Sequence, residues 1–219
     1  VPGNGRLVVN GDDPHLDEVL AMGCWTPVER FGFGEGNTWR ARLVEADGSA
    51  FEVLHDGAVL GTVRWPMLGR HNVLNGLAAL AAAHAVGVDV AAVLPSLARF
   101  RSVKRRMERL GEIGGVTVYD DFAHHPTAIE TTLSGLRARV GNARIVVAME
   151  PRSNSMRLGA HADALAPSLA GADAVVFLHR PGLAWDAATV VAALAGEGIA
   201  VPDVDALLDA LLARAQSGD

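Results

Sequence analysis

The chain has 219 residues, of which 50% are hydrophobic, and a formal net charge of −6 at pH 7. That length accommodates one large domain or two small ones, the composition argues against wholesale disorder, and the charge offers no basic surface for a nucleic-acid backbone. A single cysteine, Cys24, cannot form an internal disulfide, which predicts a reducing, cytoplasmic compartment, and no apolar run reaches the roughly 18–20 residues of a membrane span.

The N-terminal part of the chain predicts a strand, a helix and a second strand. Arg6–Asn10 is a short β-rich run, and Val28–Phe33 is a second segment of strand length. Between them, Asp13 is suited to cap a helix and Pro14 to occupy its first turn. The preceding residues, Val1–Gly5, have the composition of an interdomain loop.

The pattern then changes to short strands at Trp39–Leu43, Ala50–Leu54 and Ala58–Leu60. The dipeptides Asp47-Gly48 and Asp56-Gly57 separate them, and Asp-Gly between such runs is a strong hairpin signal. We therefore expect a small antiparallel meander.

Two helices are expected next, over residues 72–86 and 90–100. They lead into the basic segment 101–109, which has the composition of a solvated linker and contains the only lysine, Lys104. A boundary near residue 103 gives two expected domains, 1–102 and 103–219.

Beyond this boundary, strands alternate with helices, which predicts a parallel, Rossmann-like sheet and an α/β fold class. The predicted strands are Val116–Tyr119, Arg144–Met149, Ala174–Leu178 and a segment near Ile199–Val201. The predicted helices are Pro126–Ala138, His161–Leu169, Asp186–Ala195 and Val204–Ala213.

Asn72 and Asn75 form the first candidate site, near the start of the predicted helix 72–86. Their spacing places both carboxamides on one helix face. Two amides side by side offer donors and acceptors suited to the edge of an adenine ring. The alternative is that Asn72 only caps the helix and Asn75 has no role.

A second candidate site lies between the predicted strand 116–119 and the next helix. Asp120, Asp121, His124 and His125 gather there, and the carboxyl ends of strands in open α/β sheets are where ligands bind. These groups could hold ribose hydroxyls, a metal or a phosphate. A metal is disfavoured, because adjacent histidines do not share a face and no HExxH or CxxC motif is present. The alternative is a capped turn with solvated charges.

Two arginine-containing segments complete the candidates. One polar loop follows a predicted strand and contains Arg152, Ser153 and Asn154. It could bind carboxylates through the planar N–H donors of arginine, and the alternative is an ordinary solvated loop. Arg106 lies in the basic segment, where it could reach a bound phosphate if that segment joins two domains.

These segments, in this order and spacing, resemble the Mur ligase superfamily over essentially the whole chain. The motifs are Gly69-Arg70-His71-Asn72-Val73-Leu74-Asn75, Lys104-Arg105-Arg106-Met107-Glu108-Arg109, Asp120-Asp121-Phe122-Ala123-His124-His125-Pro126-Thr127 and Glu150-Pro151-Arg152-Ser153-Asn154. The last motif favours the branch that joins UDP-N-acetylmuramate to the tripeptide L-alanyl-γ-D-glutamyl-meso-diaminopimelate, because the UDP-N-acetylmuramate–L-alanine ligase carries a different loop there. That alanine ligase, a folylpolyglutamate-type ligase and a non-enzymatic nucleotide-sensing or docking domain are the alternatives.

The resemblance implies a cytoplasmic ligase of peptidoglycan recycling that uses ATP and Mg²⁺ and acts through an acyl phosphate. Residues 1–102 would be the last part of a P-loop-type central domain, and 103–219 a Rossmann-like C-terminal domain without its last strand. The implied roles are adenine binding by His71, Asn72 and Asn75, phosphate binding by Arg106, ribose binding by Asp121, a place at the reaction centre for His124 and His125, and peptide recognition by Arg152, Ser153 and Asn154. No metal ligand, nucleic-acid partner or membrane partner is implied, and the oligomeric state is left open.

One expected part of such an enzyme is missing from the sequence. A P-loop needs Gly-x-x-x-x-Gly-Lys-Ser/Thr, whereas Lys104 follows Arg101-Ser102-Val103 with no glycine loop. We therefore expect this chain alone neither to hydrolyse ATP nor to ligate a peptide.

Overall fold

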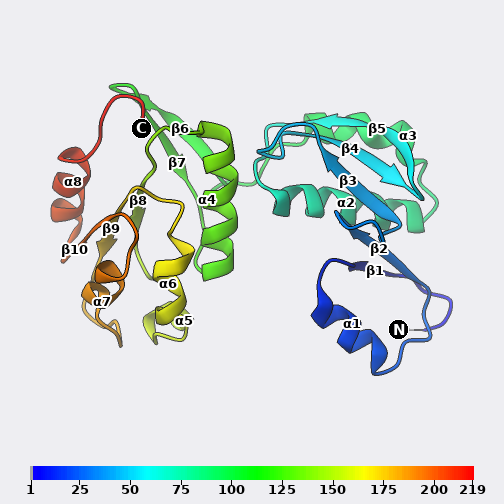
Figure 1. Cartoon of the computed structure of the whole chain (residues 1–219), viewed down its shortest axis with the longest axis horizontal. Coiled ribbons are helices and arrows are strands. Elements are labelled where there is room, and N and C mark those ends of the chain that lie inside the picture. The colour runs from blue at the N-terminus through cyan, green and yellow to red at the C-terminus, as the bar shows by residue number, and fades with distance from the viewer. Residues whose placement is uncertain (1) are drawn as a thin grey trace. The chain divides into compact units, whose positions relative to one another are not determined.

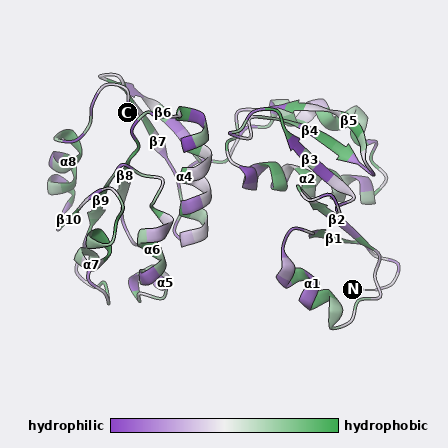
Figure 2. Cartoon of the chain, in the orientation of Figure 1, coloured by the Kyte–Doolittle hydropathy of each residue, from purple (hydrophilic) through white to green (hydrophobic). Residues whose placement is uncertain are grey.

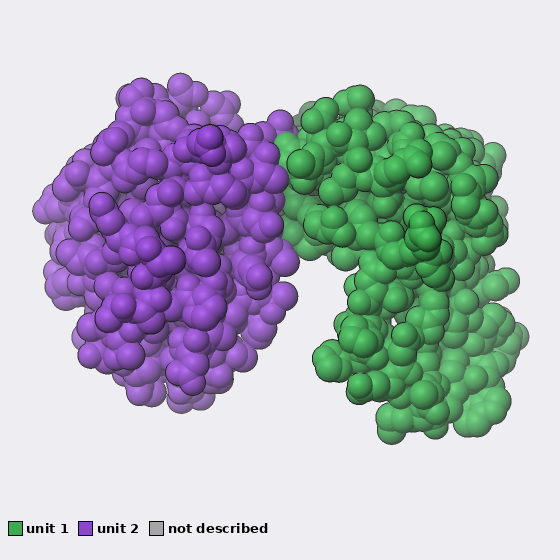
Figure 3. Space-filling model, in the orientation of Figure 1, with its two compact units in different colours: residues 1–101 green, residues 102–219 purple. Residues whose placement is uncertain are grey.

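The computed structural model describes residues 2–219, so that Val1, the first residue of the predicted opening loop, lies outside the described part. The chain forms two compact units, which Figure 3 shows in different colours. Unit 1 ends at Arg101, and unit 2 comprises Ser102–Asp219. The functional domains 1–102 and 103–219 remain a proposal.

Unit 1 is built on one mixed sheet in the order β1-β2-β3-β4-β5 (Figure 1). Its strands are β1 (Leu7–Asn10), β2 (Val28–Gly32), β3 (Trp39–Leu43), β4 (Ala50–His55) and β5 (Ala58–Arg64). The first three strands run parallel, and β3, β4 and β5 are antiparallel. The predicted opening and the predicted meander therefore both exist. They are joined by a short parallel pairing of β2 with β3, which the sequence did not indicate.

Local sequence signals explain the turns of this sheet. Helix α1 (Pro14–Ala21) starts where predicted, with the side chain of Asp13 accepting a hydrogen bond from the amide of His15. The β4–β5 turn places Asp56 at φ 48° and Gly57 at φ 81°. Two consecutive residues in the left-handed region form the tight hairpin turn that Asp-Gly favours.

The helices of unit 1 differ from the prediction at two points. Helix α2 (Arg70–Ala85) begins two residues before the predicted range 72–86, and it packs its buried residues, such as Val73 and Leu77, on the sheet core around Trp39. The predicted helix 90–100 is wrong as a single element. It divides into α3 (Val90–Val93) and the 3₁₀ helix η1 (Leu94–Arg99), because Pro95 has no amide hydrogen to continue an α-helical ladder.

Unit 2 contains a hairpin and a parallel sheet. Strands β6 (Glu108–Ile113) and β7 (Val116–Asp120) form a two-stranded antiparallel sheet, and β8 (Val146–Met149), β9 (Ala174–Leu178) and β10 (Glu197–Val201) form a parallel sheet in the order β10-β9-β8. Two predictions are corrected here. The end of the basic segment 101–109, predicted to be a linker, belongs to strand β6. The predicted strand Val116–Tyr119 was expected in the parallel sheet, but it pairs with β6. Gly114 and Gly115, at φ 61° and 81°, allow the tight turn between β6 and β7.

Helices cover both faces of the parallel sheet. They are α4 (Pro126–Val140), α5 (Asn154–Arg157), α6 (Ala162–Ser168), α7 (Ala187–Ala192) and α8 (Val204–Leu212). Every residue of β9 is buried, and its alternate residues belong to two cores. Val175 and Phe177 pack with residues of α4, α6 and α7, while Val176 and Leu178 pack with residues of α8. This two-sided burial gives the continuous apolar run that appears green in Figure 2.

Within residues 2–219, none of the helices combines the length and the apolar character needed to cross a membrane.

Candidate functional site

The first turn of α2 carries the predicted adenine residues of unit 1. Gly69, at φ 88°, precedes the helix and provides no side-chain cap. Asn72 therefore lies inside the first turn, and the alternative that it only caps the helix is wrong. The side-chain nitrogen Nδ2 of Asn72 donates to the carbonyl oxygen of Leu68 at 2.7 Å and lies 3.1 Å from Nε2 of His71. Asn75 is exposed one turn further along, so its carboxamide is accessible to a ligand.

Asp12 organises the loop that packs beside this turn, a role that no sequence motif indicated. Its carboxylate accepts hydrogen bonds from the amides of Phe33 (2.6 Å) and Gly34 (3.0 Å) and from the carboxamide of Asn37 (2.7 Å). The guanidinium carbon of Arg70 lies 3.8 Å from the centre of the Phe33 ring. Burial would raise the pKa of Asp12, but these three hydrogen bonds and the charge of Arg70 together lower it. The amides of this glycine-rich segment thus bind a carboxylate of the chain itself.

Asp12→Asn tests that network. The isosteric carboxamide keeps one acceptor but turns an NH₂ group toward N–H donors, so we expect unit 1 to lose about 1–2 kcal/mol of unfolding free energy. Urea unfolding measures this loss. The control is Asp17→Asn, because Asp17 makes a single partly exposed ion pair with Arg30 and should change stability by less than about 1 kcal/mol. Equal effects of the two substitutions would contradict an organising role for Asp12.

In unit 2, Asp121 fastens the basic segment to the turn after β7. Its Oδ2 accepts from the amide of Met107 and its Oδ1 from the amide of Ala123, each at 2.8 Å. Arg106 is exposed beside this anchor, and its guanidinium carbon is 5.9 Å from the centre of the Phe122 ring. Two predicted residues, Arg106 and Asp121, are therefore brought to the same turn.

His124 and His125 follow directly and start α4. Nδ1 of His124 is 2.9 Å from the carbonyl oxygen of Phe122, and Nδ1 of His125 accepts from the amide of Thr127 at 3.3 Å as the helix cap. The ring of His125 packs edge-on against His161, with 4.4 Å between centroids. His161 precedes α6, and a distant histidine of this kind has no local sequence signal.

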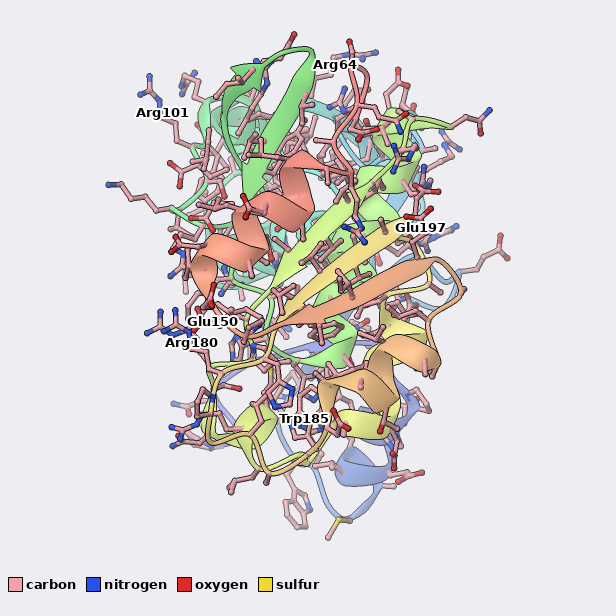
Figure 4. The ribbon with its side chains drawn as sticks, turned by 90° about the vertical axis from the view of Figure 1, so that its left-hand side faces the viewer. Arg64, Arg101, Glu150, Arg180, Trp185 and Glu197 are labelled. Atoms are coloured by element: carbon pink, nitrogen blue, oxygen red, sulfur yellow. The ribbon has the colours of Figure 1, made fainter. Side chains whose placement is uncertain are left out.

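The loop after β8 carries the remaining predicted residues. Ser153 caps the short helix α5 through its hydroxyl, and Asn154, its first residue, is exposed. Glu150 binds two arginines through one oxygen: Nε of Arg180 is 2.8 Å away and Nε of Arg152 is 3.8 Å away. Figure 4 shows Glu150 and Arg180 next to each other. Arg180 follows β9, and the sequence could not indicate that it joins Arg152, because only the pairing of β8 with β9 brings the two loops together.

A pocket of about 380 Å³ lies elsewhere in unit 1, lined by Trp39, His55, Leu60 and His84 among others. His84 belongs to the last turn of α2, and none of the predicted site residues lines this pocket. Across residues 2–219, no group of three or more His, Cys, Asp or Glu side chains could hold a metal ion. These described residues therefore offer no ready cage for Mg²⁺.

Two protein-family models match this chain. The model described as "Mur ligase middle domain" matches residues 1–83, and the one described as "Mur ligase, glutamate ligase domain" matches residues 105–219.

Similar proteins extend the match to the whole chain. The "UDP-N-acetylmuramate--L-alanyl-gamma-D-glutamyl-meso-2,6-diaminoheptandioate ligase" of Escherichia coli (strain K12) is 46% identical over 220 residues, which cover 100% of this chain and 48% of that protein. The UDP-N-acetylmuramate–L-alanine ligase of Oleidesulfovibrio alaskensis is 44% identical over 152 residues, which cover 69% of this chain and 33% of that protein. The crystal structure of a murein peptide ligase from Psychrobacter arcticus matches with a TM-score of 0.72 and 37% identity, covering 100% of this chain and 48% of that one. The chain thus spans about half the length of the relatives that it matches from end to end.

Proposed function

Because this chain belongs to the Mur ligase family, we propose that it is part of an ATP-dependent ligase that joins UDP-N-acetylmuramate to L-alanyl-γ-D-glutamyl-meso-diaminopimelate. Members of the family depend in general on ATP and magnesium. The chain is 46% identical along its whole length to a ligase named for this tripeptide, which supports the tripeptide as the acceptor substrate. The arginines in the loops after β8 and β9 are the residues on which the proposal depends.

The acceptor tripeptide is rich in carboxylates, and the loops after β8 and β9 offer guanidinium groups to bind them. Both Arg152 and Arg180 approach Glu150 through Nε, so the terminal NH₂ groups of each remain able to donate to a ligand. Two guanidiniums beside one carboxylate also leave a net positive charge. A planar fork of N–H donors matches the geometry of a carboxylate. We assign Arg152, Ser153, Asn154 and Arg180 to acceptor recognition.

We assign nucleotide binding to the residues predicted for it, His71, Asn72, Asn75, Arg106 and Asp121. Asn75 presents an exposed carboxamide, and Asn72 retains its carbonyl oxygen as an acceptor beside His71, which together suit an adenine edge. Arg106 would bind the phosphates. Asp121 would bind ribose hydroxyls through lone pairs beyond the two that accept from Met107 and Ala123, since a carboxylate has about four acceptor positions.

In the proposed reaction, ATP phosphorylates the muramyl carboxylate, and the amine of the tripeptide attacks the acyl phosphate and expels phosphate. The residues described here bind and orient the two reactants, which converts an encounter of separate molecules into a reaction between neighbouring groups. We expect them also to reduce the access of water, which would otherwise hydrolyse the acyl phosphate.

Acceptor selection tests this proposal. With the product of the complete reading frame that encodes this chain, we expect phosphate release to depend on UDP-N-acetylmuramate, ATP and the tripeptide, and L-alanine to be a poor substitute. Arg180→Gln should lower kcat/KM for the tripeptide by about tenfold or more, because a charge-assisted hydrogen bond contributes about 1.5–3 kcal/mol. Arg109→Gln is the control, since Arg109 pairs with Glu112 on the exposed face of β6. A preference for L-alanine would favour the alanine ligase instead.

A further inference from the structure

The hydrogen bond of His124 fixes the position of its proton. Nδ1 lies 2.9 Å from the carbonyl oxygen of Phe122. A carbonyl oxygen cannot donate a hydrogen bond, so Nδ1 must carry the hydrogen. In the neutral ring, Nε2 of His124 is therefore the nitrogen with the free lone pair.

The hydrogen bond of His125 fixes the opposite arrangement. Its Nδ1 accepts from the amide of Thr127 at 3.3 Å and caps α4. Nδ1 therefore bears the lone pair, and in the neutral ring the hydrogen lies on Nε2. The cap thus maintains Nε2 of His125 as a donor.

Each ring is also held in place by an aromatic neighbour. The ring of His124 packs edge-on against Phe122, with 5.1 Å between centroids, and the ring of His125 packs against His161 at 4.4 Å. Both histidines are exposed, so they are accessible to a ligand. Two adjacent imidazoles therefore offer opposite functions at Nε2, an acceptor on His124 and a donor on His125.

We infer that the two tautomers have separate roles in the ligation: His124 accepts a proton, and His125 stabilises negative charge. This inference rests on the proposed function. The amine nitrogen of the acceptor forms a bond to the carbonyl carbon of the acyl phosphate, and its surplus proton passes to Nε2 of His124. The Nε2–H of His125 donates a hydrogen bond to the carbonyl oxygen while that oxygen carries negative charge. The carbon–oxygen bond to phosphate then breaks, and inorganic phosphate leaves with the electron pair.

The tautomers can be measured on the 219-residue chain without any substrate. Two-bond ¹H–¹⁵N correlation spectra at pH about 8.5, two units above the ordinary histidine pKa of about 6.5, distinguish a protonated ring nitrogen from one with a lone pair. We expect Nδ1–H for His124 and Nε2–H for His125. Finding Nε2–H at His124 or Nδ1–H at His125 would overturn the inference.

The chemical roles are tested with asparagine variants of the complete reading-frame product. Asparagine can reproduce the Nδ1 hydrogen bond at either position, and it is a good helix cap, but it has no counterpart of Nε2. We expect His124→Asn to lower kcat by 10²- to 10⁴-fold, as for loss of a general base, and His125→Asn by 10²- to 10³-fold, as for loss of an oxyanion donor. The KM for the tripeptide should change little in both.

His15→Asn on α1 is the matched control, because His15 is exposed and far along the chain from this turn, and it should leave kcat unchanged. Preserved thermal unfolding of the variants excludes misfolding as the cause. Wild-type kcat in His124→Asn and His125→Asn would overturn the proton roles even if the tautomers are as inferred. A wild-type protein that ligates no tripeptide would overturn the proposed function and these roles with it, and the measured tautomers would be unaffected.

Discussion

Replacing Arg137 with methionine is expected to lower the unfolding free energy of unit 2 by about 3 kcal/mol. The guanidinium on α4 donates to the carbonyl oxygens of Gly141 (3.0 Å), Ala143 (2.5 Å) and Gly171 (3.0 Å) and to the carboxylate of Asp173 (2.5 Å). One side chain thus connects the end of α4 with the segments that precede β8 and β9. Methionine keeps most of the aliphatic length but removes all four hydrogen bonds, so the acceptors must find water or remain unsatisfied.

The measurement can be made specific to unit 2. Of the four tryptophans in the chain, only Trp185 belongs to this unit. Urea unfolding followed by ¹⁹F NMR of fluorotryptophan-labelled protein therefore reports its unfolding through one resonance. Arg109→Met is the control, because its single exposed ion pair with Glu112 should contribute about 1 kcal/mol or less. An Arg137→Met variant as stable as this control would show that the hydrogen bonds do not hold these segments.

The same network predicts a dependence on pH. The amide of Ile145, followed by the hydrogen bond and charge of Arg137 and the charge of Arg144, lowers the pKa of Asp173 below its ordinary 3.8 despite partial burial. A lowered pKa in the folded state stabilises the fold above the unfolded-state pKa, and this stabilisation is lost as the pH falls through the folded-state value. The stability difference between the wild type and Arg137→Met should therefore be constant near neutral pH and shrink below about pH 4. A difference that grows with acid would contradict this assignment.

Asp121→Ala is expected to lower both stability and activity. Loss of the two hydrogen bonds to Met107 and Ala123 should cost about 2–4 kcal/mol, because bonds to a charged acceptor are the stronger kind. The released segment contains Arg105 at φ 61° and Met107 at φ 49°, conformations that non-glycine residues adopt only when held. Arg106 lies between them, and we expect its displacement to reduce kcat/KM by about 100-fold or more.

Asp120→Ala is the matched control for this experiment. The neighbouring carboxylate pairs at 3.3 Å with the partly exposed Arg105, a surface ion pair of unit 2. Its loss should cost less than about 1 kcal/mol. Chemical unfolding and steady-state kinetics of the complete reading-frame product compare the two variants, and equal losses from both would refute the anchoring role of Asp121.

Family membership and the order of most elements along the chain were accessible from sequence because their signals are short and local. The polar motifs containing Asn72, Asp121 and Arg152 lie at the start of a helix or after a strand, as expected. Their assigned roles stay predictions, since no ligand contact tests them. Errors arose where an element depends on distant partners. Strand β6 is mostly exposed and rich in charged residues, so no apolar alternation indicates a strand there. Because β6 was not predicted, its partner β7 was assigned to the wrong sheet.

Several caps and turns could be predicted from local sequence alone: Asp13 caps α1, Asp56-Gly57 closes a hairpin, and Pro126 begins α4. These outcomes depend on a residue's own backbone preferences and on neighbours a few positions away. The folded structure was needed to show which strands pair, that Asp12 binds the amides of the Phe33 loop, and which side chains accompany the predicted site residues. Those contacts join segments far apart in the chain, and they follow from the shared burial of β8 with β9 and of α2 with the first sheet.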